Sequence, residues 1–183
     1  GRAQAQYNLG SMYAKGEGVS RNDEEAVKWF RAAAGQGHVA ARYRLGMAYA
    51  QGFGVPRDEA EAAKWLREAG GGGDAAAQHQ LGVAFASGRG VTLDAGEAIN
   101  WYRRAANQGY PAAQLALAYC YMSGQGVAPS YVQAYAWFTL ALSRGERNAA
   151  DNLAFLTKVM NPAQVEEAKT IAREWRPVSE GAK

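Results

Sequence analysis

Two histidines are the side chains of this 183-residue chain that are best suited to acid–base chemistry or metal binding. Imidazole titrates near neutral pH and is a common metal ligand, but either role needs a carboxylate or a second ligand beside it. His38 lies at an expected turn and His79 in an expected helix, and neither has such a partner nearby in the sequence. We therefore expect no catalytic residue, no metal site and no cofactor.

Glycine-rich segments are the second feature that can do chemistry, because the backbone N–H groups of such loops can hold phosphate. The segment Gly70-x-Gly72-x-x-Ala75 matches a degenerate dinucleotide-binding fingerprint. That motif has to follow a strand, whereas this one follows a helical pattern. Gly-x-Gly pairs also recur along the chain, but each comes directly after a helical segment, where glycine commonly ends a helix. Both features favour simple turns over phosphate sites.

Other catalytic signatures are absent from the sequence. It contains no H-E-x-x-H, C-x-x-C, G-x-S-x-G or S-x-x-K motif and no complete P-loop. A hydrolase would need paired carboxylates or a nucleophile beside a base, and neither arrangement can be placed. Cys120 is the one cysteine, which excludes an internal disulfide framework and favours a buried core side chain. The sequence therefore predicts a protein that is not an enzyme.

Charge and hydropathy limit the class of partner. The net charge is +3, from 20 Lys and Arg against 17 Asp and Glu. A nucleic-acid partner would predict a clustered stripe of Lys and Arg, which is missing. No apolar run approaches the roughly 18 residues that a membrane-spanning helix needs. We therefore expect neither nucleic-acid binding nor membrane insertion.

The elements that would position any functional side chain come from a repeat of 36 residues. Residues of one type recur at this interval: Leu9, Leu45, Leu81 and Leu117; Trp29, Trp65, Trp101 and Trp137; Gly16, Gly52, Gly88 and Gly124; Gly18, Gly54, Gly90 and Gly126. A period of this size is typical of stacked helical units that cannot bury their apolar faces alone.

Each repeat is predicted to be a helix, a loop and a second helix. In the third repeat, Leu81 lies on the apolar face of the first helix and Gly88 ends that helix. The second helix begins with the spacing of a capping box, in which two side chains satisfy each other's backbone donors. That spacing recurs at Asn22/Glu25, Asp58/Glu61, Asp94/Glu97 and Ser130/Gln133. The tryptophans are expected to fill the seams between repeats.

Both ends of the array have distinct signals. After the fourth repeat the register continues for one helix and then fails at Met160, where Asn161, Pro162 and Gln164 begin a final helix that would cap the array. Gly1 shares the register of the glycines that end each repeat, so we expect a piece of a longer protein. The run Gly70 to Gly73 suggests a softer joint between repeats two and three.

The repeat resembles the Sel-one-like repeat family, a relative of the tetratricopeptide repeats. The residues that carry the resemblance are A-x-x-x-L-G-x-x-Y-x-x-G-x-G-V, from Ala5 to Val19, and A-x-x-W-F-x-x-A, from Ala26 to Ala33. The resemblance implies an all-α fold, a right-handed α-solenoid of helix-turn-helix repeats. We expect one domain over 1–176, with repeats at about 3–38, 39–74, 75–110 and 111–146, a cap over 147–176 and a disordered tail over 177–183.

The resemblance also implies a protein-interaction scaffold rather than an enzyme. Some relatives pair cysteines within each repeat, a feature that this chain lacks. Bacterial arrays of this kind are often exported, so the resemblance leans towards a periplasmic or cell-envelope location. Oligomeric state and the identity of a partner stay open at this point.

The candidate binding residues lie on the first helix of each repeat, because these helices line the concave face in tetratricopeptide-like arrays. One position reads Gln6, Arg42, Gln78 and Gln114 and is interpreted as a structural hydrogen-bonding position. Other positions vary in a way that suits recognition, with aromatic, Met and Arg anchors. The predicted partner-binding residues are Tyr7, Asn8, Ser11, Tyr43, Arg44, Met47, His79, Gln80, Val83, Leu115 and Tyr119.

Two kinds of partner remain open for this surface. The leading hypothesis is a protein or peptide, because a row of helices offers a groove suited to an extended segment or a helix. The alternative is a glycan or cell-wall component, which would stack on Tyr7, Tyr43 and Tyr119.

Overall fold

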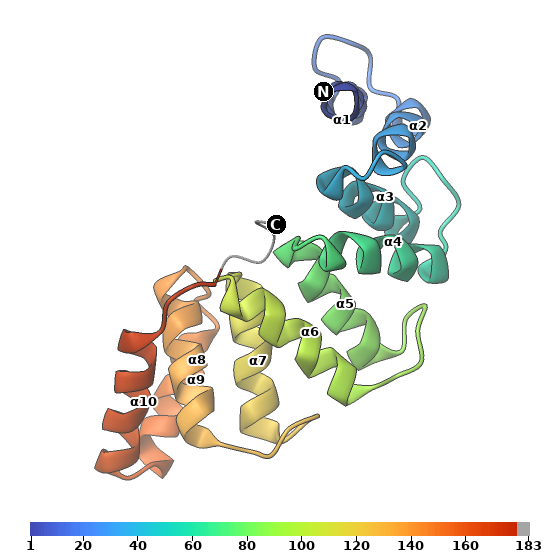
Figure 1. Cartoon of the computed structure of the whole chain (residues 1–183). Helices are drawn as coiled ribbons and strands as arrows, with labels where there is room; N and C mark the ends of the chain where they lie inside the picture. The colour runs from blue at the N-terminus through green and yellow to red at the C-terminus, as the bar shows by residue number, and fades with distance from the viewer. Residues whose placement is uncertain (179–183) are drawn as a thin grey trace. The chain divides into compact units, whose positions relative to one another are not determined.

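The structure is a computed structural model, and it describes residues 1–178. Over this range the chain forms ten α-helices and no strand (Figure 1). The helices are α1 (Arg2–Lys15), α2 (Asp23–Ala34), α3 (Val39–Gln51), α4 (Glu59–Gly71), α5 (Ala75–Ser87), α6 (Ala95–Asn107), α7 (Pro111–Ser123), α8 (Tyr131–Ser143), α9 (Ala149–Val159) and α10 (Pro162–Glu174). The expected all-α fold of helix-turn-helix repeats is confirmed.

The helices gather into two compact units. Unit 1 spans Gly1–Leu93 and contains α1 to α5, and unit 2 spans Asp94–Lys183 and contains α6 to α10. The core of unit 1 includes Leu45 and Val27, which are almost completely buried. The core of unit 2 is built around Phe138 and Leu156, both fully buried. The single domain expected over 1–176 stays a prediction.

Glycine ends the first helix of every repeat, as the sequence predicted. Gly16, Gly52, Gly88 and Gly124 follow α1, α3, α5 and α7 with φ values of 73°, 72°, 69° and 76°. Glycine adopts this left-handed conformation without the steric cost that a Cβ atom would add. The chain can therefore turn sharply into the loop that leads to the second helix.

The capping boxes predicted for the second helices are only half formed. The side chains of Asn22, Asp58, Asp94 and Ser130 each accept a hydrogen bond from the backbone N–H three residues later. The reciprocal bond is absent in three repeats because the N-cap backbone N–H already donates to a tyrosine carbonyl of the first helix, in the pairs Asn22–Tyr13, Asp58–Tyr49 and Ser130–Tyr121. A complete box is formed at α10 by Asn161 and Gln164.

In repeats two, three and four, the second glycine of the Gly-x-Gly pair marks a close approach to the preceding repeat. A Cβ atom on Gly54 would lie 2.1 Å from the carbonyl oxygen of Asp23, and one on Gly90 would lie 1.9 Å from that of Glu59. In unit 2, a Cβ on Gly126 would lie 2.2 Å from the carbonyl oxygen of Ala95. These glycines let each loop pack on the start of the preceding second helix. The loops are therefore packing elements as well as turns.

A periodic arginine also connects successive repeats. The Arg31 guanidinium donates to the Tyr49 hydroxyl at 2.9 Å, and Arg67 lies over the Phe85 ring at 5.8 Å. In unit 2, Arg103 donates to the hydroxyl of Tyr121 at 3.5 Å. Each arginine comes from a second helix and reaches an aromatic residue 18 positions later. This contact was not foreseen from the sequence.

The last two helices close unit 2 as expected of a cap. Val165 and Ala168 of α10 belong to the buried core, and Trp175 packs edge-on against Trp137 with ring centroids 6.3 Å apart. The repeat tryptophans are all half-buried, and their place in the seams between repeats stays a prediction. Of the tail 177–183 that was expected to be disordered, Val178 donates a backbone hydrogen bond to Asn107 at 2.8 Å. Residues 179–183 lie outside the described residues.

Candidate functional site

The predicted partner-binding residues occupy α1, α3, α5 and α7, the first helices of the repeats. Leu115 and Tyr119 belong to unit 2, and all of the others belong to unit 1. Within unit 1, five of them line two neighbouring pockets: Ser11, Arg44, Met47, Gln80 and Val83.

The first pocket lies between repeats one and two and has a volume of about 160 Å³. Its lining is Ser11, Ala14, Lys15, Phe30, Arg44, Met47, Ala48, Gln51 and Phe53. The floor of this pocket is apolar because it is formed by Phe30, a buried core residue. Lys15 and Arg44 place positive charge at the margin.

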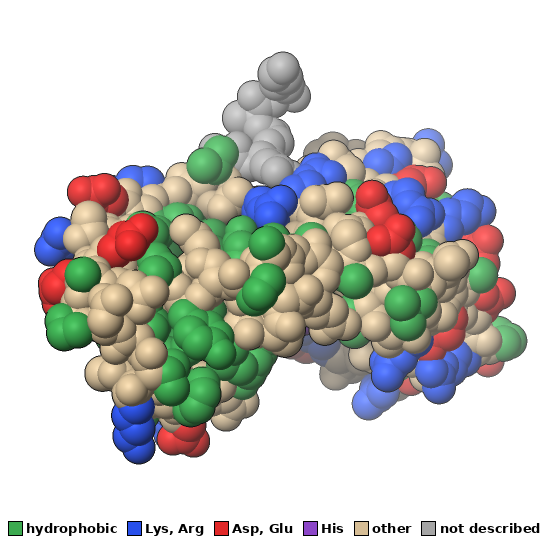
Figure 2. All heavy atoms as spheres, turned by 90° about the horizontal axis from the view of Figure 1, so that it is seen from below, with side chains coloured by type: hydrophobic (Ala, Val, Ile, Leu, Met, Phe, Trp, Pro, Cys, Tyr) green, Lys and Arg blue, Asp and Glu red, His purple; other side chains and the backbone are tan. Residues whose placement is uncertain are grey.

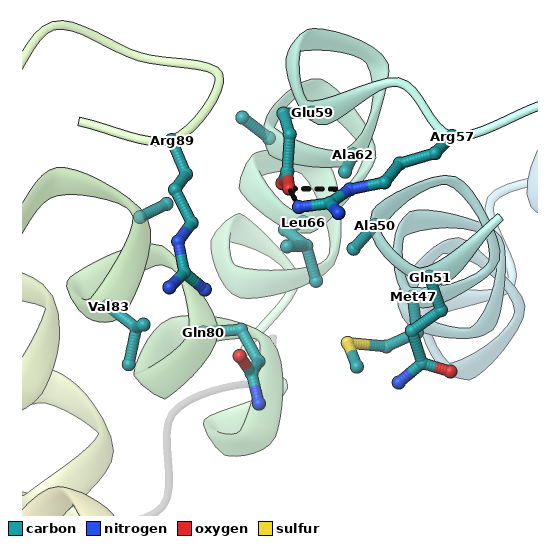
Figure 3. Close-up of a pocket in the computed structure, with 12 residues that line it drawn as sticks. Met47, Ala50, Gln51, Arg57, Glu59, Ala62, Leu66, Gln80, Val83 and Arg89 are labelled. Atoms are coloured by element: carbon teal, nitrogen blue, oxygen red, sulfur yellow. Dashed lines mark hydrogen bonds and ion pairs between the residues drawn. The ribbon is translucent and has the colours of Figure 1, made fainter. Parts of the chain in front are cut away.

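The second pocket lies between repeats two and three and has a volume of about 310 Å³ (Figure 3). Its lining is Met47, Ala50, Gln51, Arg57, Glu59, Ala62, Ala63, Leu66, Gln80, Val83, Ala84 and Arg89. Met47 and Gln51 line both pockets, so the two are adjacent.

The two pockets are the same structural feature, repeated. A shift of 36 residues converts Ser11, Phe30, Arg44 and Phe53 of the first pocket into Met47, Leu66, Gln80 and Arg89 of the second. The backbone framework therefore supplies the hollow, and the variable residues determine its chemistry. The apolar floor is kept by Phe30 and Leu66, while the polar margin changes from one repeat to the next.

Positive charge is in excess around both pockets. The Arg57 guanidinium donates to Glu59, with its Nε 3.0 Å from the carboxylate, and Lys15 pairs with Glu17 at 3.5 Å. Within residues 1–178, the guanidinium groups of Arg44 and Arg89 form no ion pair and no hydrogen bond, and both side chains are exposed. Two cations are therefore left to bind a ligand.

One of the predicted positions contributes more to packing than to an open surface. Tyr7 stacks on His38 with ring centroids 4.7 Å apart and packs against the core of unit 1. Its counterparts include Leu115, which packs against the core of unit 2, and His79, whose pKa burial lowers below its ordinary value. Tyr43 is half-buried as well. The sequence could not show this, because inward and lateral faces of a helix have similar residue types.

Several pocket residues were missed from the sequence. Arg57, Glu59 and Arg89 come from loops and from the start of a second helix, whereas the predicted residues all lie on first helices. The 36-residue register is the signal that could have found Arg89, since Arg89 occupies the repeat position of Phe53.

Unit 2 presents an aromatic version of the same helix face. Tyr119 is exposed, packs edge-on against Phe138 and accepts a hydrogen bond from Asn152 at 3.1 Å. One repeat further, Phe155 of α9 lies in the register of Tyr119 and is 50% exposed. In the view of Figure 2, hydrophobic side chains gather on the visible face of this unit. The repeat register of the predicted residues therefore extends to Phe155 in α9.

The part of the chain that the structure describes has few groups suited to other chemistry. It contains no cluster of three or more His, Cys, Asp or Glu side chains arranged to hold a metal. Cys120 is buried in unit 2, and burial raises the pKa of its thiol, as expected of a core residue. None of the described helices has the length and apolar character needed to cross a membrane.

The repeat framework defines a class of helical-repeat protein, and comparison with known proteins identifies the family. The family model of the Sel1 repeat matches residues 3–38, 39–74, 75–110 and 111–146, so this chain belongs to the Sel1 repeat family. Proteins built from Sel1 repeats generally mediate protein–protein interactions, and the repeat scaffold is generally non-catalytic.

Solved structures that are similar to this chain include two from bacteria. A Sel1 repeat protein from Oxalobacter formigenes is 34% identical, with a TM-score of 0.76, over 96% of this chain and 73% of that chain. A protective antigen of uropathogenic Escherichia coli strains, which displays an SLR fold, is 28% identical, with a TM-score of 0.64. That match covers 96% of this chain and 45% of the antigen. No curated protein sequence matches the chain.

Proposed function

We propose that this chain is a non-catalytic interaction module that binds a segment of another protein on the faces of its first helices. The observation that carries the proposal is the pair of equivalent pockets in unit 1, offset by one repeat and sharing Met47. A row of equivalent hollows suits a linear chain, which can place successive side chains in successive hollows, better than it suits one small molecule.

The side chains around the pockets support a protein partner. Arg44 and Arg89 are exposed, and Met47 is half-buried at the boundary of the two pockets. Arginine, methionine and aromatic residues are enriched where proteins bind one another, because they combine apolar area with directional contacts. Membership of the Sel1 repeat family favours the same class of partner.

A glycan partner is less well supported by the aromatic geometry. Sugar stacking needs an aromatic ring with an open face, and one face of Tyr7 is occupied by His38. Tyr43 is half-buried, which leaves Tyr119 as the exposed member of the three. A protein segment uses the apolar pockets as well, so we favour it.

The test is a pull-down from the source organism with the double variant Arg44→Ala/Met47→Ala. The matched control is Lys28→Ala/Lys64→Ala, which changes exposed residues of α2 and α4 outside both pockets. Loss of a partner from the first variant and its retention by the control would support the proposal. If the partner is retained equally by both, with both folded by circular dichroism, the assigned face is wrong.

A further inference from the structure

We infer that the two pockets of unit 1 select an extended protein segment that is acidic and carries apolar side chains. The inference rests on the proposed function and adds the chemistry of the partner. It comes from three observations. The charged side chains that line the pockets are mostly positive, Arg44 and Arg89 are exposed without an ion pair in the described residues, and both pockets have an apolar floor.

The lining charge is strongly one-sided. The charged side chains that line the two pockets are Lys15, Arg44, Arg57, Arg89 and Glu59. The single carboxylate among them, Glu59, is held by Arg57. A basic segment would meet like charge here, and unfavourable charge juxtaposition is a strong determinant of specificity. An acidic segment would meet cations at both pockets.

Arg89 and Arg44 are the groups available to receive that segment. In Figure 3 the Arg89 side chain hangs from its loop, with its guanidinium group on the side of Gln80 and Val83. The guanidinium is a planar fork that binds carboxylates through two parallel hydrogen bonds. Arg44 lines the first pocket from α3, at the repeat position that Gln80 holds in the second pocket. One carboxylate can therefore be bound beside each hollow.

The apolar floor explains why the partner also needs hydrophobic side chains. Leu66 and Phe30 are nearly buried at the base of the second and first pockets, and Met47 separates the two. A volume of about 310 Å³ in the second pocket accommodates an aliphatic side chain. Burial of such a side chain supplies affinity, while the arginines supply selectivity.

The same floor separates a protein segment from a nucleic acid. Cationic grooves for single-stranded nucleic acid need aromatic platforms on which bases stack. The floor of the second pocket is instead made of Leu66, Met47 and Val83, which are aliphatic or thioether side chains. In the first pocket Phe30 is buried, and Arg21 lies over the Phe53 ring at 5.7 Å, so neither ring is an open platform. An acidic polypeptide uses both the cations and the floor, whereas a phosphate backbone would use only the cations.

The experiment measures binding of three labelled synthetic peptides to the intact chain by fluorescence anisotropy. The peptides repeat Ser-Glu-Leu, Ser-Gln-Leu or Ser-Lys-Leu, and a labelled single-stranded oligonucleotide is a fourth probe. We expect the Ser-Glu-Leu peptide to bind most tightly and to weaken as salt is raised, because exposed ion pairs are screened. Arg44→Gln and Arg89→Gln should each weaken it about two- to fivefold, as exposed ion pairs are worth little individually.

Arg2→Gln is the matched control, because Arg2 is an exposed arginine of α1 outside both pockets. Equal binding of the Ser-Glu-Leu and Ser-Gln-Leu peptides, or equal losses in all three variants, would overturn the acidic selectivity. Tighter binding of the oligonucleotide than of any peptide would also overturn it. If all three peptides bind alike and Met47→Ser weakens each of them, the proposed function survives while this inference fails. Absence of peptide binding also contradicts the inference, and the pull-down then judges the proposed function separately.

Discussion

The side-chain amide of Gln78 donates a hydrogen bond to the carbonyl oxygen of Gly70 at 2.9 Å, and Gln78 is fully buried. Gly70 lies in the last turn of α4, where backbone carbonyls have no partner within the helix. The same relationship joins Gln114 to Ala106, and Arg42 replaces the glutamine to reach Ala34. Repeats two, three and four therefore each cap the second helix that precedes them, in line with the structural hydrogen-bonding role predicted for this position.

Gln78→Ala should lower the free energy of unfolding by about 0.5–1.5 kcal/mol, because it removes a buried hydrogen bond and leaves the Gly70 carbonyl with the Gly73 N–H as its donor at 3.1 Å. Urea denaturation checks this value. Gln80→Ala, two residues along the same helix, should change stability by less than about 0.5 kcal/mol because Gln80 is half-buried at the pocket margin. Equal effects of the two substitutions would show that the hydrogen bond is unimportant.

Gly90→Ala should be more destabilising than Gly18→Ala, although both glycines have positive φ. A left-handed non-glycine residue costs about 1–3 kcal/mol in either case. At Gly90 the new Cβ would also meet the Glu59 carbonyl oxygen at 1.9 Å, whereas at Gly18 it would meet only the end of Met12 at 3.4 Å.

The forced backbone shift at Gly90 should add roughly 1–3 kcal/mol to that cost. Thermal and urea unfolding of the two variants measure the difference. Similar losses of unfolding free energy in the two variants would mean that the loop moves freely away from α4. The close approach between repeats would then not contribute to stability.

Gly71→Ala should stabilise the protein by about 0.4–1 kcal/mol, because Gly71 is helical and a Cβ there would meet nothing within 4 Å. Gly73→Ala is the contrasting variant and should destabilise, since Gly73 has a φ of 92°. Denaturant unfolding distinguishes the two. Stabilisation by both would indicate that the turn adopts another conformation.

The softer joint expected at Gly70 to Gly73 stays a prediction. The turn has the hydrogen bonds of its counterparts: Asp74 donates to Ala69 at 3.1 Å as Tyr110 donates to Ala105 at 3.1 Å. Four glycines lose more conformational entropy on ordering, so faster amide exchange is expected here. Hydrogen exchange equal to that of the 107–110 turn would contradict it.

His79 should make the protein less stable in mild acid. Burial lowers the pKa of the folded-state imidazole below its ordinary value of 6.5, so the unfolded chain binds more protons in this range. The contribution of neutral His79 to the free energy of unfolding is therefore fully present above pH 6.5. It is lost as the pH falls towards the folded-state pKa. Tyr7 and Tyr43 occupy the same repeat position, which makes His79→Tyr a conservative replacement.

Unfolding free energies measured between about pH 7.5 and pH 5 should fall more steeply for the native chain than for His79→Tyr. Other titrating groups are common to both proteins, so they cancel in the difference. Identical slopes, or a native chain that gains stability relative to the variant in acid, would be incompatible with a buried neutral imidazole.

The local sequence was sufficient to predict the helices, their ends and the interval between equivalent residues. Gly88 and Asp94, for example, mark boundaries through backbone conformation and hydrogen bonding within a few residues, which depend little on the rest of the chain. The interpretation of Gln78 also held, because comparison of repeats separated positions that keep their type from those that vary.

Tertiary structure decided which of the varying residues face a pocket and which face a neighbouring helix. Tyr7 and Met47 both appeared to be exposed anchors, yet Tyr7 stacks on His38 while Met47 lines two hollows. Arg89 joined the site from a loop that no helical pattern would have selected. Helical periodicity assigns a residue to a direction around one axis, but its burial depends on what the adjacent repeat places in that direction, and that contact forms only when the helices pack.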